Sequence, residues 1–125
     1  MSEYVAVDGC KLDFKSSTHS GSISITNDPS DVVKCNGKNT FIGQIAFSVS
    51  GFTGDAITNG DGTGSGIILG GSQKCTSGSQ PLVLENDSIT ILVTGTAGEG
   101  QSKHTETANV EVYVKGAGQS VCKMT

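Results

Sequence analysis

The chain has 125 residues, a length that suits one domain with a modest core. Its net charge is −4 and it contains neither arginine nor a basic cluster, so it lacks the electrostatic footprint of a nucleic-acid-binding protein. Glycine accounts for 18 residues, aromatic residues make up 5% and tryptophan is absent, so any core must be built from small side chains. This composition favours strands and tight turns over helices.

The N-terminal residues predict the compartment in which the chain is made. Residues 1–4 carry no basic region followed by an apolar run, which a signal peptide would require. No apolar stretch approaches the ~20 residues that a membrane-spanning helix needs. We therefore expect a chain that is synthesised in the cytoplasm without a signal peptide and that is exported, if at all, by a route that does not read one.

Short stretches of alternating polar and apolar residues predict strands along the whole chain. The expected strands cover residues 4–7, 10–14, 22–26, 32–35, 41–52, 67–69, 82–84, 88–94 and 110–114. Asn36-Gly37 is the strongest hairpin signal. Residues 51–66 are rich in glycine and predict a flexible insertion, and residues 95–107 predict a polar loop. No helical periodicity of four turns interrupts this pattern, so residues 1–125 are predicted to form a single all-β domain.

A degenerate repeat organises the second part of the chain. Residues 78–87 combine a Gly-x-x-Pro turn, a short apolar run and a closing turn. Residues 35–44 have the same layout, and residues 116–123 begin it again. These units are spaced by roughly forty residues, so we expect repeat-like units from about residue 31 to residue 125.

Catalytic and nucleotide-binding patterns do not match this sequence. No serine lies in Gly-x-Ser-x-Gly, and no Gly-Lys-Ser/Thr motif exists, because Gly37-Lys38 is followed by Asn39. The loop that starts at Asn59 has oxygen ligands like those of a calcium loop, but the position that should be acidic is Gly70. The sequence therefore favours a protein that is not an enzyme.

The cysteines are the residues most able to carry chemistry. They number four, with no CxxC pair, and they are Cys10, Cys35, Cys75 and Cys122. Three alternatives remain open: buried free thiols, disulfides, or a zinc or iron site completed by His19 or His104. The missing signal peptide argues against disulfides. Cys35, Cys75 and Cys122 each lie near a repeat turn, as three related positions in a pseudo-symmetric fold would.

The repeat units resemble those of PAAR-repeat proteins, the small conical tips on the spikes of contractile phage tails and type VI secretion systems. Residues 78–87 are similar to that family's Gly-Lys-Pro-Ala-Ala-Arg-x-Gly-Asp unit at Gly78, Pro81 and Asp87. Gly37-Lys38 and Gly118 match more loosely, and the Pro-Ala-Ala-Arg tetrapeptide itself is absent. The resemblance implies a conical, pseudo-three-fold fold made of short strands and tight turns.

The resemblance also implies a function and a set of partners. It predicts the structural tip of a membrane-piercing spike, placed on a virion tail or a secretion apparatus, with one copy capping a trimeric β-helical spike protein. The target membrane would be contacted transiently. The repeat-turn residues expected at the spike interface are Gly37, Lys38, Gly78, Pro81, Asp87 and Gly118. In the family, three histidines and one cysteine hold a metal near the apex. Here only two histidines exist, so either cysteines substitute for the missing ligands or the site is lost.

A second interpretation belongs to a different class. Alternating strands at roughly ten-residue spacing also suit a β-sandwich. That fold would indicate a binding or decoration module, such as a phage capsid or adhesin-like domain, without pseudo-three-fold symmetry.

Overall fold

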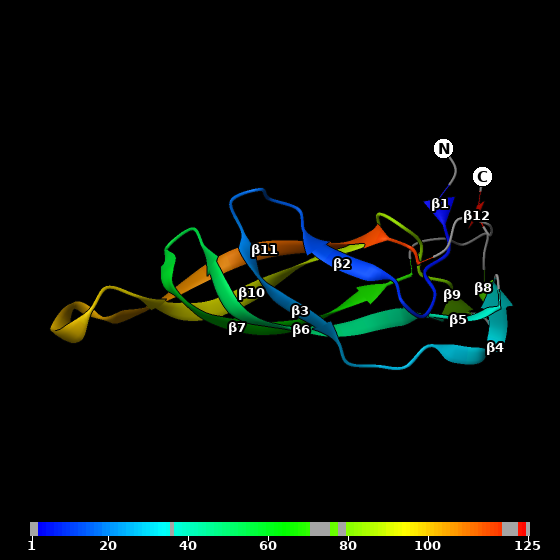
Figure 1. The fold of residues 1–125 in the computed structure, drawn as a ribbon, viewed down its shortest axis with the longest axis horizontal. Helices are drawn as coiled ribbons and strands as arrows, with labels where there is room; N and C mark the ends of the chain where they lie inside the picture. Colours follow the sequence, from blue (N-terminus) through cyan, green and yellow to red (C-terminus); the bar gives the residue numbers. More distant parts are fainter. Residues whose placement is uncertain (1–2, 36, 71–75, 78–79, 119–122, 125) are drawn as a thin grey trace.

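The structure is a computed structural model that describes residues 3–35, 37–70, 76–77, 80–118 and 123–124, with the backbone alone at 3, 30–35, 76–77, 80–81 and 123–124. Most of these residues lie in strands, so the all-β prediction is confirmed (Figure 1). The strands are β1 (Glu3–Tyr4), β2 (Lys11–Phe14), β3 (Ser20–Ile25), β4 (Ser30–Cys35), β5 (Lys38–Thr40), β6 (Gln44–Gly54), β7 (Ile57–Leu69), β8 (Thr76–Ser77), β9 (Gln80–Pro81), β10 (Ser88–Ala97), β11 (His104–Gly116) and β12 (Lys123–Met124). A 3₁₀ turn, η1 (Gly100–Ser102), joins β10 to β11. Within the described residues, no helix has the length and apolar character needed to cross a membrane.

Six of the strands form one antiparallel sheet in the order β2-β11-β10-β7-β6-β3. Read around the sheet, this order is the chain order with a break between β2 and β3, and the two end strands return to each other's neighbourhood. The sheet is therefore a nearly closed barrel rather than the two stacked sheets of a β-sandwich. We call the break between β2 and β3 the seam.

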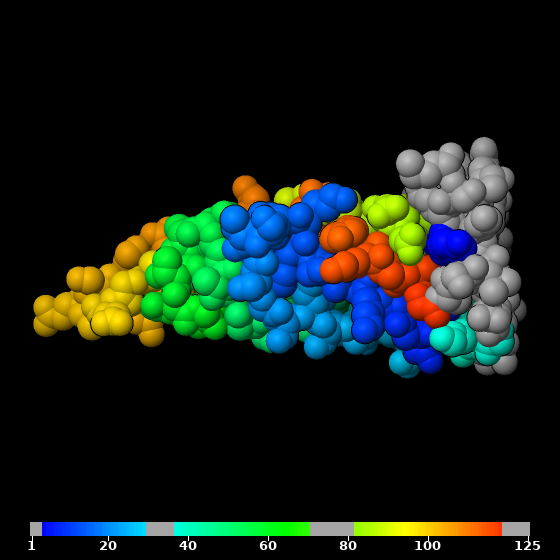
Figure 2. Space-filling model, turned by 45° about the horizontal axis from the view of Figure 1, so that its top comes forward, coloured from blue at the N-terminus to red at the C-terminus, as the bar shows by residue number. Residues whose placement is uncertain are grey.

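The barrel tapers because its hairpins differ in length. The β10–β11 hairpin extends past the other strands to form the narrow end, and β1, β4, β5, β8, β9 and β12 lie at the opposite, blunt end (Figure 1). The space-filling view shows the same narrowing toward the β10–β11 turn (Figure 2). Because fewer strands reach each successive level toward the β10–β11 turn, the cross-section of the barrel decreases in that direction.

The barrel interior is filled by alternate residues of the long strands. On β6 the buried residues are Ile45, Phe47 and Val49, as the alternation predicts, and on β11 they include Val110, Val112 and Val114. Their neighbours along each strand face outward and are mostly polar, such as Ser48 on β6 and Glu111 on β11. The core is thus one continuous cluster that runs along the barrel axis.

Two predicted loops are wrong, because both form strands. The glycine-rich stretch 51–66 belongs to β6, β7 and the turn between them, and residues 95–107 complete β10, the η1 turn and β11. On β7, glycine at inward-facing positions makes room for large neighbours. A Cβ added at Gly62 would lie 2.8 Å from Phe52 Cβ, and one at Gly66 would lie 3.0 Å from Phe47 Cζ and also contact Ile91. Glycine here serves packing between strands rather than flexibility.

Candidate functional site

Three short segments meet at the blunt end and form a closed ring of hydrogen bonds. The segments, which we call the ring segments, are residues 5–7, 40–42 and 82–84. The amide of Ala6 donates to Val83 O at 2.8 Å, the amide of Val83 donates to Phe41 O at 3.2 Å, and the amide of Phe41 donates to Ala6 O at 3.1 Å. Each central residue thus donates to one segment and accepts from the other, which relates the three segments by a pseudo-three-fold axis.

The residues on either side of each central residue complete the ring. They form three antiparallel bridges: Val5 with Leu84, Val7 with Thr40, and Ile42 with Leu82. The central residues Ala6, Phe41 and Val83 belong to the barrel core. Val5, Leu82 and Leu84, with Ile42 against them, form a second, smaller apolar cluster. Since successive side chains of an extended segment point to opposite faces, the ring joins the barrel core to a separate blunt-end cluster.

Three two-stranded arms, β1–β12, β4–β5 and β8–β9, lead into the ring. One strand of each arm continues directly into a ring segment. These strands are β1, β5 and β9. Each ring segment is followed by an outgoing and a returning barrel strand. The chain therefore contains three equivalent units, each made of an arm strand, a ring segment and two barrel strands.

A turn with one residue at positive φ follows every ring segment. These residues are Gly9 at 94°, Gly43 at 81° and Asn86 at 77°, values that glycine and asparagine tolerate. The amide of Cys10 donates to Val7 O at 2.9 Å in the first unit, and the amide of Asp87 donates to Leu84 O at 3.1 Å in the third. The same local chemistry thus redirects the chain from the ring into the barrel.

Five of the six predicted repeat-turn residues surround the ring. Asp87 accepts the amide of Leu84 at 2.9 Å through its carboxylate and so closes the third turn. The ammonium group of Lys38 donates to Gly118 O at 3.0 Å, which links β5 to the residues that follow β11. Gly118, at φ 88°, packs so closely on the first turn that a Cβ there would lie 2.9 Å from Cys10 N. Gly37 has a φ of 77°, and Pro81 lies in β9 opposite Thr76. Gly78 lies outside the described residues.

The hydrogen bonds show that the repeat begins earlier in the chain than the sequence pattern predicts. Residues 5–7 form the first ring segment, whereas residues 116–118 lead toward β12, the first strand of an arm. The arm of the first unit pairs β1 with β12, two strands near opposite ends of the chain, so no short turn joins them. The sequence does carry a signal for this unit, namely an apolar tripeptide followed by a turn. It is Val5-Ala6-Val7 before Asp8-Gly9, which parallels Leu82-Val83-Leu84 before Glu85-Asn86.

Cys10 lies directly beyond the first ring segment as a free, buried thiol. Burial, reinforced by the negative charge of Asp8, raises its pKa to about 11. The thiol therefore stays protonated at neutral pH, and a protonated thiol is neither a good nucleophile nor a ready metal ligand. For Cys10 this environment favours the buried-thiol alternative.

The two histidines lie in different connections, His19 between β2 and β3 and His104 at the start of β11. The side chain of His19 is only 7% exposed, with Nε2 3.2 Å from Asp55 Oδ1 and its ring against Phe52. His104 lies on the β10–β11 hairpin, where Nδ1 is 2.8 Å from Ser102 O and Nε2 is 2.7 Å from a Glu106 carboxylate oxygen. The Ser102 carbonyl, followed by Glu106, raises the pKa of His104.

The predicted metal ligands are distributed along the axis. His104 and Gly116 are the ends of β11, twelve residues apart, which is about 40 Å of strand, and Gly116 pairs with Lys11 next to Cys10. His104 and Cys10 therefore lie at opposite ends of the barrel. Cys35 is in β4 opposite Lys38, while Cys75 and Cys122 lie outside the described residues. No group of three or more histidine, cysteine, aspartate or glutamate side chains gathers in the described part of the chain, and the metal site stays a prediction.

The central ring residues Ala6, Phe41 and Val83 are the positions that sequence reasoning missed. Their side chains look like those of ordinary core residues, and their special role lies in backbone groups from distant parts of the sequence that meet in the fold.

Comparison of the chain with protein-family models, curated proteins and solved structures gives no match.

Proposed function

We propose that this chain is the structural, non-enzymatic tip of a membrane-piercing spike in a contractile injection machine, either a phage tail or a type VI secretion-like system. Its blunt end would cap a trimeric β-helical spike protein, with one copy per trimer. The observation that carries the proposal is the closed cycle of hydrogen bonds from Ala6 to Val83 to Phe41 and back.

The cycle matters because of symmetry. A trimeric partner presents three equal surfaces around its axis, and a single chain can engage all three alike only if it repeats its own surface three times. The ring and its three arms supply that repetition at the blunt end. The short arm strands also present backbone edges to which strands of a β-helix could pair.

The opposite end suits entry into a barrier. The tip is a single hairpin, so its cross-section is the smallest of the molecule (Figure 2). Residues 99–105 at its turn are exposed and polar or glycine. A narrow end whose turn carries no apolar side chain fits transient contact with a membrane rather than residence in it. The proposal places the mature protein at the tip of a virion tail or secretion apparatus, after synthesis in the cytoplasm.

The test is association with the trimeric spike protein encoded beside this chain. Native mass spectrometry and light scattering should give one copy of this chain per spike trimer. The charge reversal Lys38→Glu at the blunt end should weaken binding by about tenfold, through loss of the Gly118 contact and of local charge. Its matched control, Glu99→Lys at the tip, should leave binding unchanged. No association, a ratio other than one to three, or greater sensitivity to the tip variant would refute the proposal.

A further inference from the structure

The seam is where the first unit departs from the other two. In the second unit β6 and β7 pair from Gln44–Leu69 to Gly54–Ile57, and in the third β10 and β11 pair from Ser88–Tyr113 to Ala97–His104. The corresponding strands of the first unit, β2 and β3, are fully described and are not paired with each other. One of three equivalent positions in the barrel therefore lacks its ladder of hydrogen bonds.

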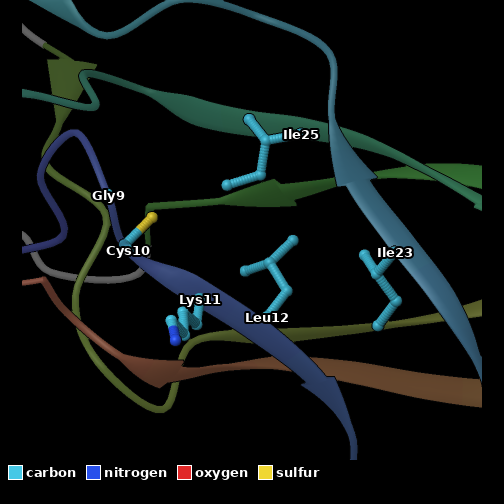
Figure 3. Close-up of a pocket in the computed structure, with 6 residues that line it drawn as sticks. All are labelled: Gly9, Cys10, Lys11, Leu12, Ile23 and Ile25. Carbon is cyan, nitrogen blue, oxygen red and sulfur yellow. The ribbon is translucent and has the colours of Figure 1, made fainter.

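A cavity of about 450 Å³ occupies the seam. It is lined by residues 9–12 on one side and by Ile23 and Ile25 on the other. The side chains of Cys10, Leu12, Ile23 and Ile25 extend into the space between the strands, whereas Lys11 points away from it (Figure 3). The side chains that enter the cavity are therefore uncharged, since the Cys10 thiol is protonated, while polar atoms supply nearly half of the lining.

Backbone groups on both sides face the same space. The amide of Lys15 donates to Glu111 O, and Asp13 is opposite Tyr113, so odd-numbered residues of β2 turn toward β11 and Leu12 turns toward the seam. The amide of Thr26 donates to Ala46 O, so by the same alternation Ile23 and Ile25 turn away from β6. These backbone groups have no strand partner across the seam.

The other end of β2 is protected against pairing. The next seam-facing amide, that of Phe14, donates to the carboxylate of Asp13 at 2.7 Å. A side chain that occupies its neighbour's edge amide is one way in which a strand edge is blocked. The open part of the seam is thus the part nearest the ring, where the amide of Cys10 bonds to Val7 of the first ring segment.

We infer that the seam accepts one extended segment of the trimeric spike as an additional barrel strand. This inference rests on the proposed function. The seam-facing amides of Leu12, Ile23 and Ile25 match a peptide strand rather than a lipid or an ion. The uncharged side chains that enter the cavity favour uncharged side chains on that strand. The partner on the ring side is the spike, so its chain is the one within reach. Because only one of the three described units is open, only one of the three identical spike chains is used in each complex.

Hydrogen exchange on the complex of this chain with the spike trimer tests the inference. The amides of Leu12, Ile23 and Ile25 should exchange at least about tenfold more slowly in the complex, as expected for amides that gain a hydrogen bond. The amide of Ser24 already faces β6 and serves as the internal control. A one-to-three complex without protection at the seam would overturn the inference and leave the proposed function intact. Absence of any complex would overturn the proposed function itself.

Substitutions give a second readout. Ile23→Lys, which places a charge in the cavity, should weaken binding to the spike by about tenfold, whereas Ser24→Lys on the exposed face should not. Thermal unfolding confirms that each variant folds. If Ile23→Lys does not fold, Leu12→Pro removes a seam-facing amide and leaves the β11 ladder intact. Unchanged binding by a folded variant contradicts the inference. Slower hydrogen exchange at the seam with increasing concentration of this chain, measured without the spike, would also contradict the inference. A second copy of the chain would then be the occupant.

Discussion

Gly66→Ala distinguishes a packed β7 strand from a flexible glycine-rich loop by the sign of its effect on stability. In a loop, alanine would be neutral or would stabilise the fold by about 0.4–1 kcal/mol, because it restricts the unfolded chain. In the structure, Gly66 faces the barrel interior, and an added Cβ would lie 3.0 Å from Phe47 Cζ and still closer to Ile91 Cγ2. Neither neighbour is free to retreat, since Phe47 is 1% exposed and Ile91 is 8% exposed.

The expected cost follows from this crowding. Overpacking of a closed core by one methyl group costs typically about 1–3 kcal/mol. For a domain of this size that corresponds to a fall in melting temperature of about 4–12 °C. The φ angle of Gly66 is not in the left-handed region, so backbone strain does not contribute.

Thermal and urea-induced unfolding followed by circular dichroism measures the effect. Ser65→Ala, one residue earlier and exposed on the same strand, is the matched control and should change the unfolding free energy by less than about 0.5 kcal/mol. A Gly66→Ala variant as stable as the wild type, or more stable, would refute the packing of β7 described above.

Three further predictions concern ionisable and metal-binding groups. The amide of Phe14 and the ammonium of Lys115 hold the pKa of Asp13 below its usual value, so this carboxylate stabilises the fold above pH 4 and the contribution disappears as the pH falls through the lowered pKa. Asp13→Asn should therefore show a smaller loss of melting temperature between pH 6 and pH 2 than the wild type; an equal loss would contradict this assignment. Cys10, with its pKa raised to about 11, should resist iodoacetamide at pH 8 in the folded protein and react once unfolded, as mass mapping of the modified peptide can check. Elemental analysis of protein prepared without chelator should find about one equivalent of zinc or iron if the cysteines form a site, with thermal stability lost on chelation. Less metal together with free thiols after unfolding would favour buried thiols, and neither metal nor free thiols would indicate disulfides.

Much of the local structure was readable from the sequence. Strict alternation at residues 45–49 and 110–114 gave the correct buried faces, because a strand places every second side chain on one side. Two of the three units were marked by a short apolar run followed by a turn residue, Leu84 before Asn86 and Phe41 before Gly43. These turns could be predicted because the turn residues act through local backbone geometry. The all-β class followed from the same patterns and from the shortage of helix-forming stretches.

Other features depend on residues that meet only in the folded chain. Whether glycine at position 66 means flexibility or close packing is decided by Phe47 and Ile91 on neighbouring strands. The ring depends on backbone groups of Ala6, Phe41 and Val83, which any apolar residue would carry, so no side-chain pattern announces it. The seam is likewise invisible in the sequence of β2 and β3, because pairing is a property of two strands and of the turn between them. Composition and periodicity thus determined which residues form strands and which faces are buried, whereas long-range backbone hydrogen bonding decided how three units close into one tapering barrel.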